Sequence, residues 1–248
     1  EKELRIRNNA EVFTPSWICN EQNNLADDAW FGEKGVFNTS NNKQWSTNYN
    51  KIKFSNKTWE DYVKSKRLEI SCGEAPYLVS RYDTVTGKKI KIEDRIGLLD
   101  RKLRVVSENV DDYEQWIEWA TIAMKSVYGF DWQGDNVLLA RENLLYTFID
   151  YYRKKFDKKP DIDLVKDIAD IISWNIWQMD GLKYVIPNSC RNQKITQMTL
   201  FGDLTTEQVC EGCKDGDNKK HNGIYCKIMN WETNRKIKFT TLLKKGMK

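Results

Sequence analysis

The chain has 248 residues, enough for one large domain or for one domain with a small appendage. Hydrophobic residues make up 40% of it, with ten Trp and eleven Tyr, so it can bury a sizeable core and wholesale disorder is excluded. Forty Lys and Arg against 36 Asp and Glu give a net charge of +4, which excludes a strongly acidic protein and is too small to establish a nucleic-acid partner. No apolar run is long enough for a membrane span and no signal peptide is visible, so we expect a cytoplasmic protein whose six Cys form no disulfide framework.

The first 110 residues carry weak periodic patterns. Residues 38–56 hold six Asn with Ser, Thr and Lys between them, which predicts a polar surface loop. A short helix is predicted over 57–67 and a short strand over 68–71. Residues 84–106 contain a Thr-Gly pair between alternating segments, which is typical of a hairpin or an irregular insertion.

From Asp111 onward the apolar residues follow a regular period. Their spacing predicts three helices, one that begins near Asp111 and two that cover 136–154 and 161–173. Short apolar runs predict strands over 128–132 and 175–179. The order strand, helix, strand, helix, helix, strand indicates an α/β fold with a parallel sheet.

Ligands of such sheets bind where the strands end at their carboxyl side. The three predicted strands end at Cys72-Gly73-Glu74, at Asp131 and at Asp180. A turn of small residues around Gly73 lets the backbone approach a ligand, although a single Gly at a strand end is more often only a tight turn. A carboxylate at Asp131 can accept two hydrogen bonds from the hydroxyls of a ribose, and the alternative role of helix N-cap suits Asp135 better.

Four segments of residues 11–180 occur in the order of a known motif series. Together they resemble the S-adenosylmethionine-binding half of the adenine-N6 DNA methyltransferases of restriction–modification systems. The first segment, Val12-Phe13-Thr14-Pro15, is similar to the FTP motif, and the second, residues 68–78, is similar to D/E-P-x-x-G-x-G-x-F-L. The third, residues 128–144, is similar to YGxD…LAxxNL, and the fourth, residues 175–182, is similar to NIxxGDAL.

The resemblance implies a Rossmann-like methyltransferase sheet with flanking helices, and S-adenosylmethionine as the cofactor. It also implies DNA as a partner, bound mainly by parts that are not in this chain. The cofactor-binding residues that it implies are Thr14 near the methionine part, Glu69 as the acid nearest that end, Gly73 in the turn, Asp131 on the ribose and Asp180 on the adenine amine, with Asn230 as the fallback for Asp180.

The chain departs from the family pattern at several positions. Ile70 replaces the usual Pro, Ala75 replaces the second Gly, and Gln178-Met179 replaces the small residue before the acid. The family's catalytic motif, [DNS]-Pro-Pro-[YFW], is absent, since none of the four Pro residues are adjacent. That motif holds the flipped adenine and its amine for attack on the sulfonium methyl. We therefore expect this chain to be the front part of a longer methyltransferase, which binds the cofactor and transfers nothing by itself.

A separate group of residues near the C-terminus predicts a metal site. The spacing Cys210-x2-Cys213-x7-His221-x4-Cys226 offers three thiolates and the only His of the chain, and a two-residue spacer sets two thiolates at the distance that zinc requires. Four protein ligands close a zinc site, so its expected role is structural. The alternative is three reduced Cys in a surface loop beside an ordinary His. Residues 224–243 are expected to form a hairpin that turns at 232–235.

The sequence divides into three expected parts. Residues 1–67 form an N-terminal segment of helix and loop with the FTP motif, residues 68–200 form the S-adenosylmethionine-binding α/β core, and residues 201–248 form a small zinc-tied lobe with the hairpin. Two alternatives stay open. One is a zinc-containing module that binds nucleic acid or protein on a degenerate methyltransferase-like sheet. The other is a complete small methyltransferase for another substrate, for which no catalytic residue is apparent.

Overall fold

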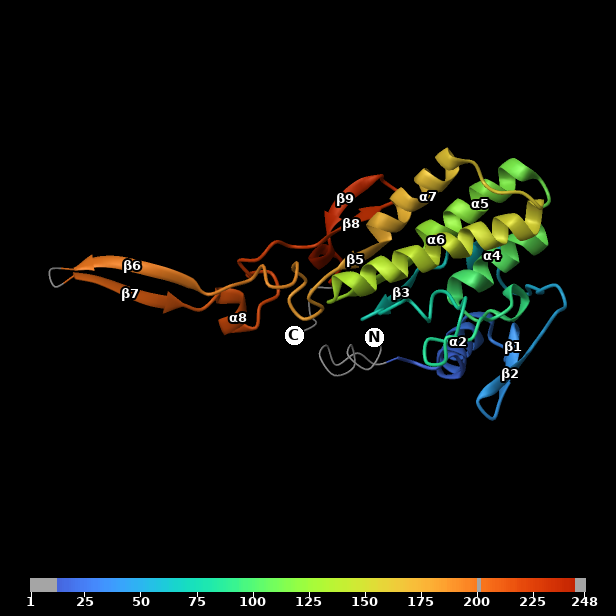
Figure 1. The fold of residues 1–248 in the computed structure, drawn as a ribbon, viewed down its shortest axis with the longest axis horizontal. Coiled ribbons are helices and arrows are strands. Elements are labelled where there is room, and N and C mark those ends of the chain that lie inside the picture. Colours follow the sequence, from blue (N-terminus) through green and yellow to red (C-terminus); the bar gives the residue numbers. More distant parts are fainter. Residues whose placement is uncertain (1–12, 200–201, 244–248) are drawn as a thin grey trace.

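The computed structural model describes residues 13–199 and 202–243, and its centre is a sheet of three parallel strands (Figure 1). The strands are β3 (Arg67–Ile70), β4 (Val127–Asp131) and β5 (Ile176–Gln178), in the order β3-β4-β5. Their register pairs Glu69 with Gly129 and Phe130 with Trp177, so all three strands end at one edge. The predicted α/β class with a parallel sheet is confirmed.

Helices pack on one face of this sheet and enclose the main hydrophobic core (Figure 1). They are α4 (Leu98–Asn109), α5 (Tyr113–Lys125), α6 (Gly134–Phe156) and α7 (Ile162–Asn175). Carboxylates cap two of them, since Asp112 accepts from the Gln115 N–H and Asp161 from the Leu164 N–H. Three of these helices match the predicted helices within a few residues. None of the described helices has the length and apolar character needed to cross a membrane.

Two segments before β4 differ from their predictions. Instead of forming a loop throughout, residues 38–56 contain a short hairpin of β1 (Asn38–Asn41) and β2 (Gln44–Thr47). The segment 84–106 is not a hairpin, because only one isolated bridge, Tyr82 to Lys89, is formed there. Its first part is irregular, which agrees with the alternative prediction, and the short 3-10 helix η1 (Ile92–Asp94) and α4 then follow, which were not predicted. Buried apolar side chains recur at helical spacing in α4, at Leu99, Leu103 and Val106, and they explain this difference.

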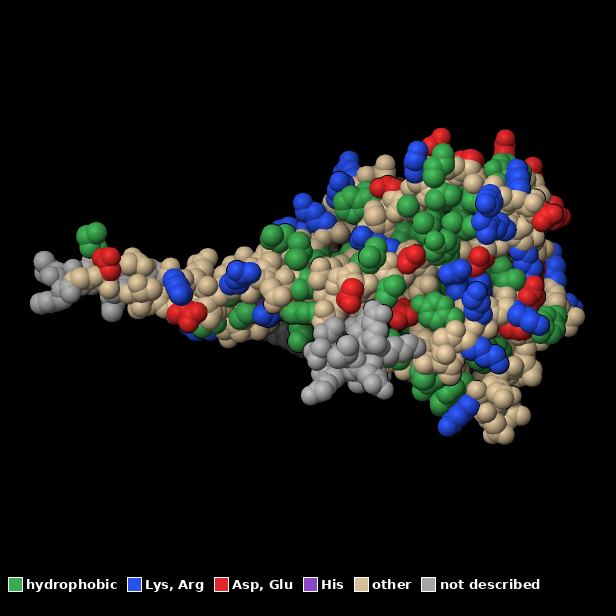
Figure 2. All heavy atoms as spheres, in the orientation of Figure 1, with side chains coloured by type: hydrophobic (Ala, Val, Ile, Leu, Met, Phe, Trp, Pro, Cys, Tyr) green, Lys and Arg blue, Asp and Glu red, His purple; other side chains and the backbone are tan. Residues whose placement is uncertain are grey.

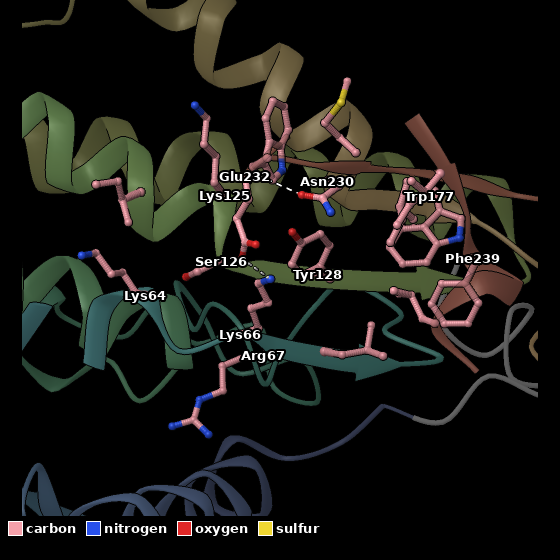
Figure 3. A pocket seen from close by; sticks show the side chains of 17 residues that line it. Lys64, Lys66, Arg67, Lys125, Ser126, Tyr128, Trp177, Asn230, Glu232 and Phe239 are labelled. Atoms are coloured by element: carbon pink, nitrogen blue, oxygen red, sulfur yellow. Dashed lines mark hydrogen bonds and ion pairs between the residues drawn. The ribbon is translucent and has the colours of Figure 1, made fainter. Parts of the chain in front are cut away.

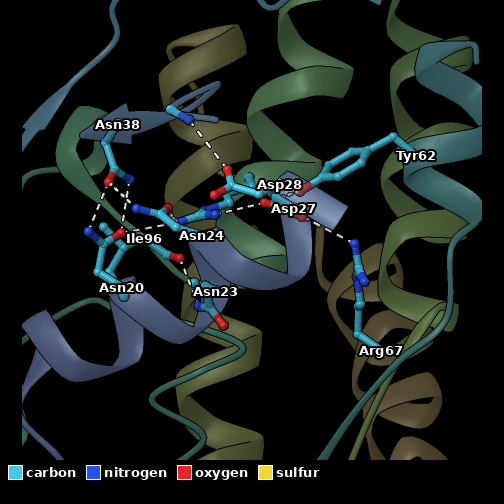
Figure 4. Close-up of polar contacts among 12 residues, drawn as sticks. Asn20, Asn23, Asn24, Asp27, Asp28, Asn38, Tyr62, Arg67 and Ile96 are labelled. Carbon is cyan, nitrogen blue, oxygen red and sulfur yellow. Dashed lines mark hydrogen bonds and ion pairs between the residues drawn. The ribbon is translucent and has the colours of Figure 1, made fainter. Parts of the chain in front are cut away.

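The N-terminal helix α2 (Ser16–Phe31) is attached to the core by buried polar groups, as is the short helix α3 (Trp59–Lys64) (Figure 4). Asp27 of α2 pairs with Arg101 at 2.7 Å and with Arg67 at 3.1 Å, and it accepts the Tyr62 hydroxyl at 3.0 Å. Asn23 donates to the backbone carbonyls of Tyr77 and Ile96. Because one carboxylate joins helices and a strand that are distant in sequence, Asp27 fixes where the N-terminal segment lies.

The second face of the sheet is covered only in part (Figure 3). The strands β8 (Lys227–Asn230) and β9 (Arg235–Lys238) form the expected hairpin, and with the 3-10 helix η2 (Phe239–Leu242) they cover a small core around Phe130 and Trp177. Beside this core lies an apolar groove of about 570 Å³, rimmed by lysines. Leu68 and Ile70 of the edge strand β3 are exposed.

An antiparallel ribbon extends away from the α/β body (Figure 1). It consists of β6 (Gln193–Thr199) and β7 (Gly202–Gln208), and the one-turn helix α8 (Glu211–Asp215) follows it at its base. The expected division of the chain after residue 200 falls between these two paired strands. The ribbon brings the segments that flank it, around residues 190 and 210, close together in space.

We expect the substitution Asp27→Ala to lower the free energy of unfolding by about 3–5 kcal/mol, because it leaves the buried Arg101 guanidinium without its counter-charge. The change is measured by urea denaturation. The matched control is Glu21→Ala on the exposed side of the same helix, which should cost less than about 0.5 kcal/mol. Equal effects of the two substitutions would show that the Asp27 network does not hold α2.

Candidate cofactor pocket and metal centre

A pocket of about 360 Å³ opens at the carboxyl edge of the sheet. Four of the five cofactor-binding residues predicted from the sequence line it, namely Thr14, Glu69, Gly73 and Asp131. These residues come from three segments that are far apart in the chain. The sheet register explains their meeting, because β3 and β4 are parallel neighbours and end side by side.

The turn after β3 forms the floor of this pocket. Ser71, Gly73 and Ala75 all have positive φ angles, of 52°, 53° and 63°. Gly73 suits this conformation, and a Cβ built there would meet nothing within 4 Å, so the backbone borders open space. Ala75, which stands where the family pattern has Gly, adopts a conformation that a side chain disfavours.

Asp131 connects this turn to the start of α6. Its Oδ2 accepts the Gly73 N–H at 2.9 Å, and its Oδ1 accepts the Gln133 N–H at 2.8 Å and the Asn136 amide at 3.3 Å. A carboxylate offers about four acceptor positions, so Asp131 orders the pocket and keeps acceptor capacity toward it. The carboxylate is nearly buried, and hydrogen bonds made there are stronger than in water.

Glu69 is the second acid of the pocket, and its side chain is also nearly buried. Burial, with a smaller contribution from the charge of Asp131, raises the pKa of this carboxyl to about 8, although the N–H groups of Tyr77 and Leu78 that it accepts act to lower the pKa. A carboxyl with this pKa is largely neutral at pH 7, and a nearby cation would favour its ionised form.

The N-terminal segment is held at the pocket by residues that the sequence did not single out. The Thr84 hydroxyl donates to the Thr14 carbonyl at 2.8 Å, and Asp83 accepts the Ser16 N–H at 2.8 Å. Phe13 and Thr14 therefore form one wall of the pocket, whereas Val12 of the same motif lies outside the described residues. Asp83 and Thr84 stand at the start of the turn 83–87, and no motif identified in the sequence signalled their contact with the N-terminal segment.

Other residues that line the pocket were also not predicted from the sequence. They could have been found only from their position in the chain, because their residue types do not point to a binding site. Trp132, Gln133 and Asn136 lie between the end of β4 and the first turn of α6, where a ligand at the sheet edge meets the chain. Glu74, which also lines the pocket, is fixed by the Tyr82 hydroxyl at 2.5 Å. Side chains at this helix start are close to its positive end, which favours acidic ligand groups.

Asp180 does not line the pocket, which corrects its predicted role. Its Oδ1 accepts the N–H groups of Leu182 at 2.9 Å and of Lys183 at 3.1 Å, so the carboxylate is used to close the turn after β5. The fallback, Asn230, is also elsewhere. It lies on β8 at the apolar groove of the second sheet face, where its side chain accepts from the hairpin turn (Figure 3).

A second site lies at the base of the β6–β7 ribbon. The ligand atoms of Cys190, Cys210, Cys213 and His221 all lie within 4.8 Å of one another. The His221 Nδ1 is 3.7, 3.8 and 3.6 Å from the sulfur atoms of Cys190, Cys210 and Cys213. Two thiolates on one tetrahedral zinc at about 2.3 Å are about 3.8 Å apart. The group can therefore hold a metal ion such as zinc.

The ligand set corrects one predicted residue, because Cys190 takes the place that the sequence assigned to Cys226. The Cys226 side chain lies in the small core under the sheet, its Sγ donates to the Gln178 carbonyl at 3.4 Å, and burial raises its pKa to about 11. Cys190 is twenty residues before Cys210, and only the pairing of β6 with β7 brings it near. No local pattern in residues 193–208 predicted this pairing.

The short helix α8 shapes the other side of the centre. A Cβ at Gly212 would lie 2.6 Å from the His221 backbone N and 2.8 Å from its Nδ1, so only glycine fits between Cys210 and Cys213. Desolvation opposes ionisation of Cys210, but the N–H groups of Cys213 and Asn222 and the His221 ring outweigh it and lower its pKa to about 6. A thiolate at neutral pH is the form that binds zinc.

We expect purified protein to carry one zinc ion per chain, and Cys190→Ser to lose most of it while Cys226→Ser keeps it. The reason is that, of these two cysteines, Cys190 belongs to the group of four ligand residues and Cys226 does not. Zinc content is measured by inductively coupled plasma mass spectrometry. Retained zinc in Cys190→Ser together with loss in Cys226→Ser would restore the ligand set predicted from the sequence.

We expect wild-type protein to lose stability between about pH 5 and pH 8, and Glu69→Gln to lose less. The folded-state pKa of Glu69 is raised to about 8, so in this range the native state binds more protons than the unfolded state and stability falls as pH rises. The slope approaches about 1.4 kcal/mol per pH unit for one proton. Urea denaturation at pH 5.5, 6.5 and 7.5 measures it, and equal slopes in both proteins would contradict the assignment.

The comparisons with known proteins add no relative. No family model matches the chain, and neither a curated protein nor a solved structure matches it. The family resemblance therefore rests on the motifs quoted above, and the function has to be argued from the geometry of the pocket.

Proposed function

We propose that this chain is the S-adenosylmethionine-binding part of an adenine-N6 DNA methyltransferase of a restriction–modification system. One observation carries the proposal. The residues that three separate motifs assign to the cofactor, Thr14, Glu69 with Gly73, and Asp131, line a single pocket at the carboxyl edge of a parallel sheet. Unrelated residues would have no reason to converge at the edge where such sheets bind nucleotides.

The groups in the pocket fit the parts of this cofactor. Asp131 accepts from the ribose hydroxyls, since a carboxylate can accept two bonds at once. Glu69 and Thr14 face the methionine part, whose ammonium and sulfonium charges favour the ionised form of Glu69. Gly73 lets the backbone approach, because no side chain fills the space beside it. Trp132, whose side chain is exposed directly after Asp131, offers the adenine an apolar surface in place of Asp180.

The role of the chain in the reaction is binding and orientation. S-adenosylmethionine would supply the methyl group when bound, and Glu69 and Asp131 of the pocket would hold it. The sequence has no Pro-Pro pair, so it contains no motif of the family that would hold an adenine amine. The metal centre, with four protein ligands, is closed to substrate and ties the ribbon to the body.

A second reading has its own support. The Gly73 N–H and the Gln133 N–H already occupy Asp131, and Ala75 narrows the turn. If these contacts close the carboxyl edge of the sheet to the cofactor, the chain is a zinc-containing module that binds nucleic acid or protein and no longer binds S-adenosylmethionine. Titration with the cofactor separates the two functions.

We expect zinc-loaded wild-type protein to bind S-adenosylmethionine in isothermal titration calorimetry, and Asp131→Asn to bind at least about tenfold more weakly. The substitution keeps the shape of the side chain and removes the charge that accepts both ribose hydroxyls, and lost bonds to a charged group cost about 1.5–3 kcal/mol.

The matched control is Asp135→Asn, an exposed acid one turn away that does not line the pocket, and its affinity should equal that of wild type. Absence of binding to the wild type would refute the cofactor pocket and favour the zinc-containing module.

A further inference from the structure

A second cavity, of about 390 Å³, lies between the segment 81–95 and the second half of α6. Five of its nine lining residues are basic, and one is acidic. The basic residues are Arg81, Lys89, Arg95, Arg153 and Lys154. Figure 2 shows this side of the molecule, where Lys and Arg side chains gather below α6. Neither the motifs nor the proposed cofactor pocket uses this cavity.

The inner wall of the cavity is a rigid pair of guanidinium groups. Arg81 Nε and Arg95 Nη2 both donate to the same oxygen of Asp150, at 3.0 and 2.7 Å. The Arg95 side chain is only 8% exposed, and its Nη1 lies 3.8 Å from Asp100. Two buried or half-buried cations held by shared carboxylates keep a fixed geometry, which the flexible lysines at the surface do not have.

The acids near the cavity all have partners. Asp150 holds the two arginines, Glu93 pairs with Lys154 at 2.5 Å, and Asp94 accepts from the side chains of Thr47 and Tyr49. Asp83 accepts from backbone and side-chain groups of its own turn and from Ser16. No carboxylate near this cavity is left for a further cation.

Two of the basic residues have no such partner. The side chains of Lys89 and Arg153 are exposed, and neither forms an ion pair or a side-chain hydrogen bond with any residue in the described ranges 13–199 and 202–243. They lie at the cavity on opposite sides, one from the 81–95 segment and one from α6. The lining therefore carries an excess of positive charge, which favours an anionic ligand.

We propose that this cavity binds a phosphate group of the DNA backbone. Arginine and lysine together suit a phosphate, because the guanidinium offers paired donors and the ammonium a point charge. The other walls are Tyr82, Ile90 and Ile92, and the Tyr82 hydroxyl is engaged by Glu74 and Asn143, so nothing in the cavity reads a base edge. The contact positions the duplex without reading its sequence.

The cavity is linked to the cofactor pocket through Tyr82. This residue lines the basic cavity, and its hydroxyl donates to Glu74, which lines the cofactor pocket together with Thr84. The segment 81–95 thus borders both cavities, through Tyr82 at the basic cavity and through Thr84 at the cofactor pocket. A phosphate bound in the basic cavity therefore holds the duplex on the same side of the body as the cofactor pocket. The identification of DNA as the source of the phosphate rests on the proposed function, whereas the anion site rests on the side chains alone.

The test is the salt dependence of duplex binding. A fluorescein-labelled 20-base-pair duplex is titrated with zinc-loaded protein at 50 to 200 mM NaCl, and anisotropy gives the affinity. The double variant Lys89→Gln and Arg153→Gln should weaken binding about tenfold at 100 mM and make the slope of log K against log salt less negative by about 0.9, since one phosphate contact is lost. Circular dichroism at the melting transition checks that the variant is folded.

The matched control is the double variant Lys34→Gln and Lys166→Gln, which removes the same charge from exposed sites on other elements. It should keep the slope of the wild type. A wild-type slope in the cavity variant, an equal loss in the control, or no duplex binding by the wild type would overturn the proposal.

Failure of the proposed function would be visible separately. S-adenosylmethionine is titrated into the same cavity variant in the absence of DNA, and its affinity should equal that of the wild type. Duplex binding through the cavity without any cofactor binding would support the phosphate site and contradict the methyltransferase.

Discussion

The parallel pairing of β3 with β4 is the constraint on which the rest of the site depends. Because Ile70 lies opposite Phe130, both strands end at one edge, and the Cys72 N–H continues the ladder by donating to the Phe130 carbonyl at 2.8 Å. One residue later the Gly73 N–H reaches the Asp131 carboxylate at 2.9 Å. The same ladder thus places the turn and the nearly buried carboxyl groups of Glu69 and Asp131 around one pocket, which neither strand could form alone.

The pocket also needs a wall that the sheet does not supply, and buried electrostatics provide it. Asp27 joins α2 to Arg101 and Arg67, and the segment before α2 then lies against the turn, where Thr84 and Asp83 bind its backbone. Buried ion pairs contribute little net stability compared with apolar packing, but they are demanding in geometry. In this chain they fix the N-terminal segment at the one place where Phe13 and Thr14 face the pocket.

The ribbon of β6 and β7 depends on contacts at its base rather than on packing against the sheet. A two-stranded ribbon has no hydrophobic face of its own and is marginal in isolation. Here the ligand atoms of Cys190 before it and of Cys210, Cys213 and His221 after it converge at its base, at separations that suit a tetrahedral metal. A metal ion held there would join the segments before and after the ribbon, which the pairing of β6 with β7 already brings together.

The sequence by itself determined the α/β class, the three strand ends, three helices of the core and the hairpin of β8 and β9, because these follow from local period and from residues at strand termini. It also determined four of the residues that line the pocket at the sheet edge and three of the four residues in the Cys/His group that can hold a metal ion. Only the tertiary structure decided the rest. Asp180 closes its own turn and Cys226 packs in a small core. Cys190 replaces Cys226 because the pairing of β6 with β7 brings Cys190 close to Cys210, twenty positions later. The Asp27 network and the basic cavity likewise join residues 35 or more positions apart, and no local pattern encodes such contacts.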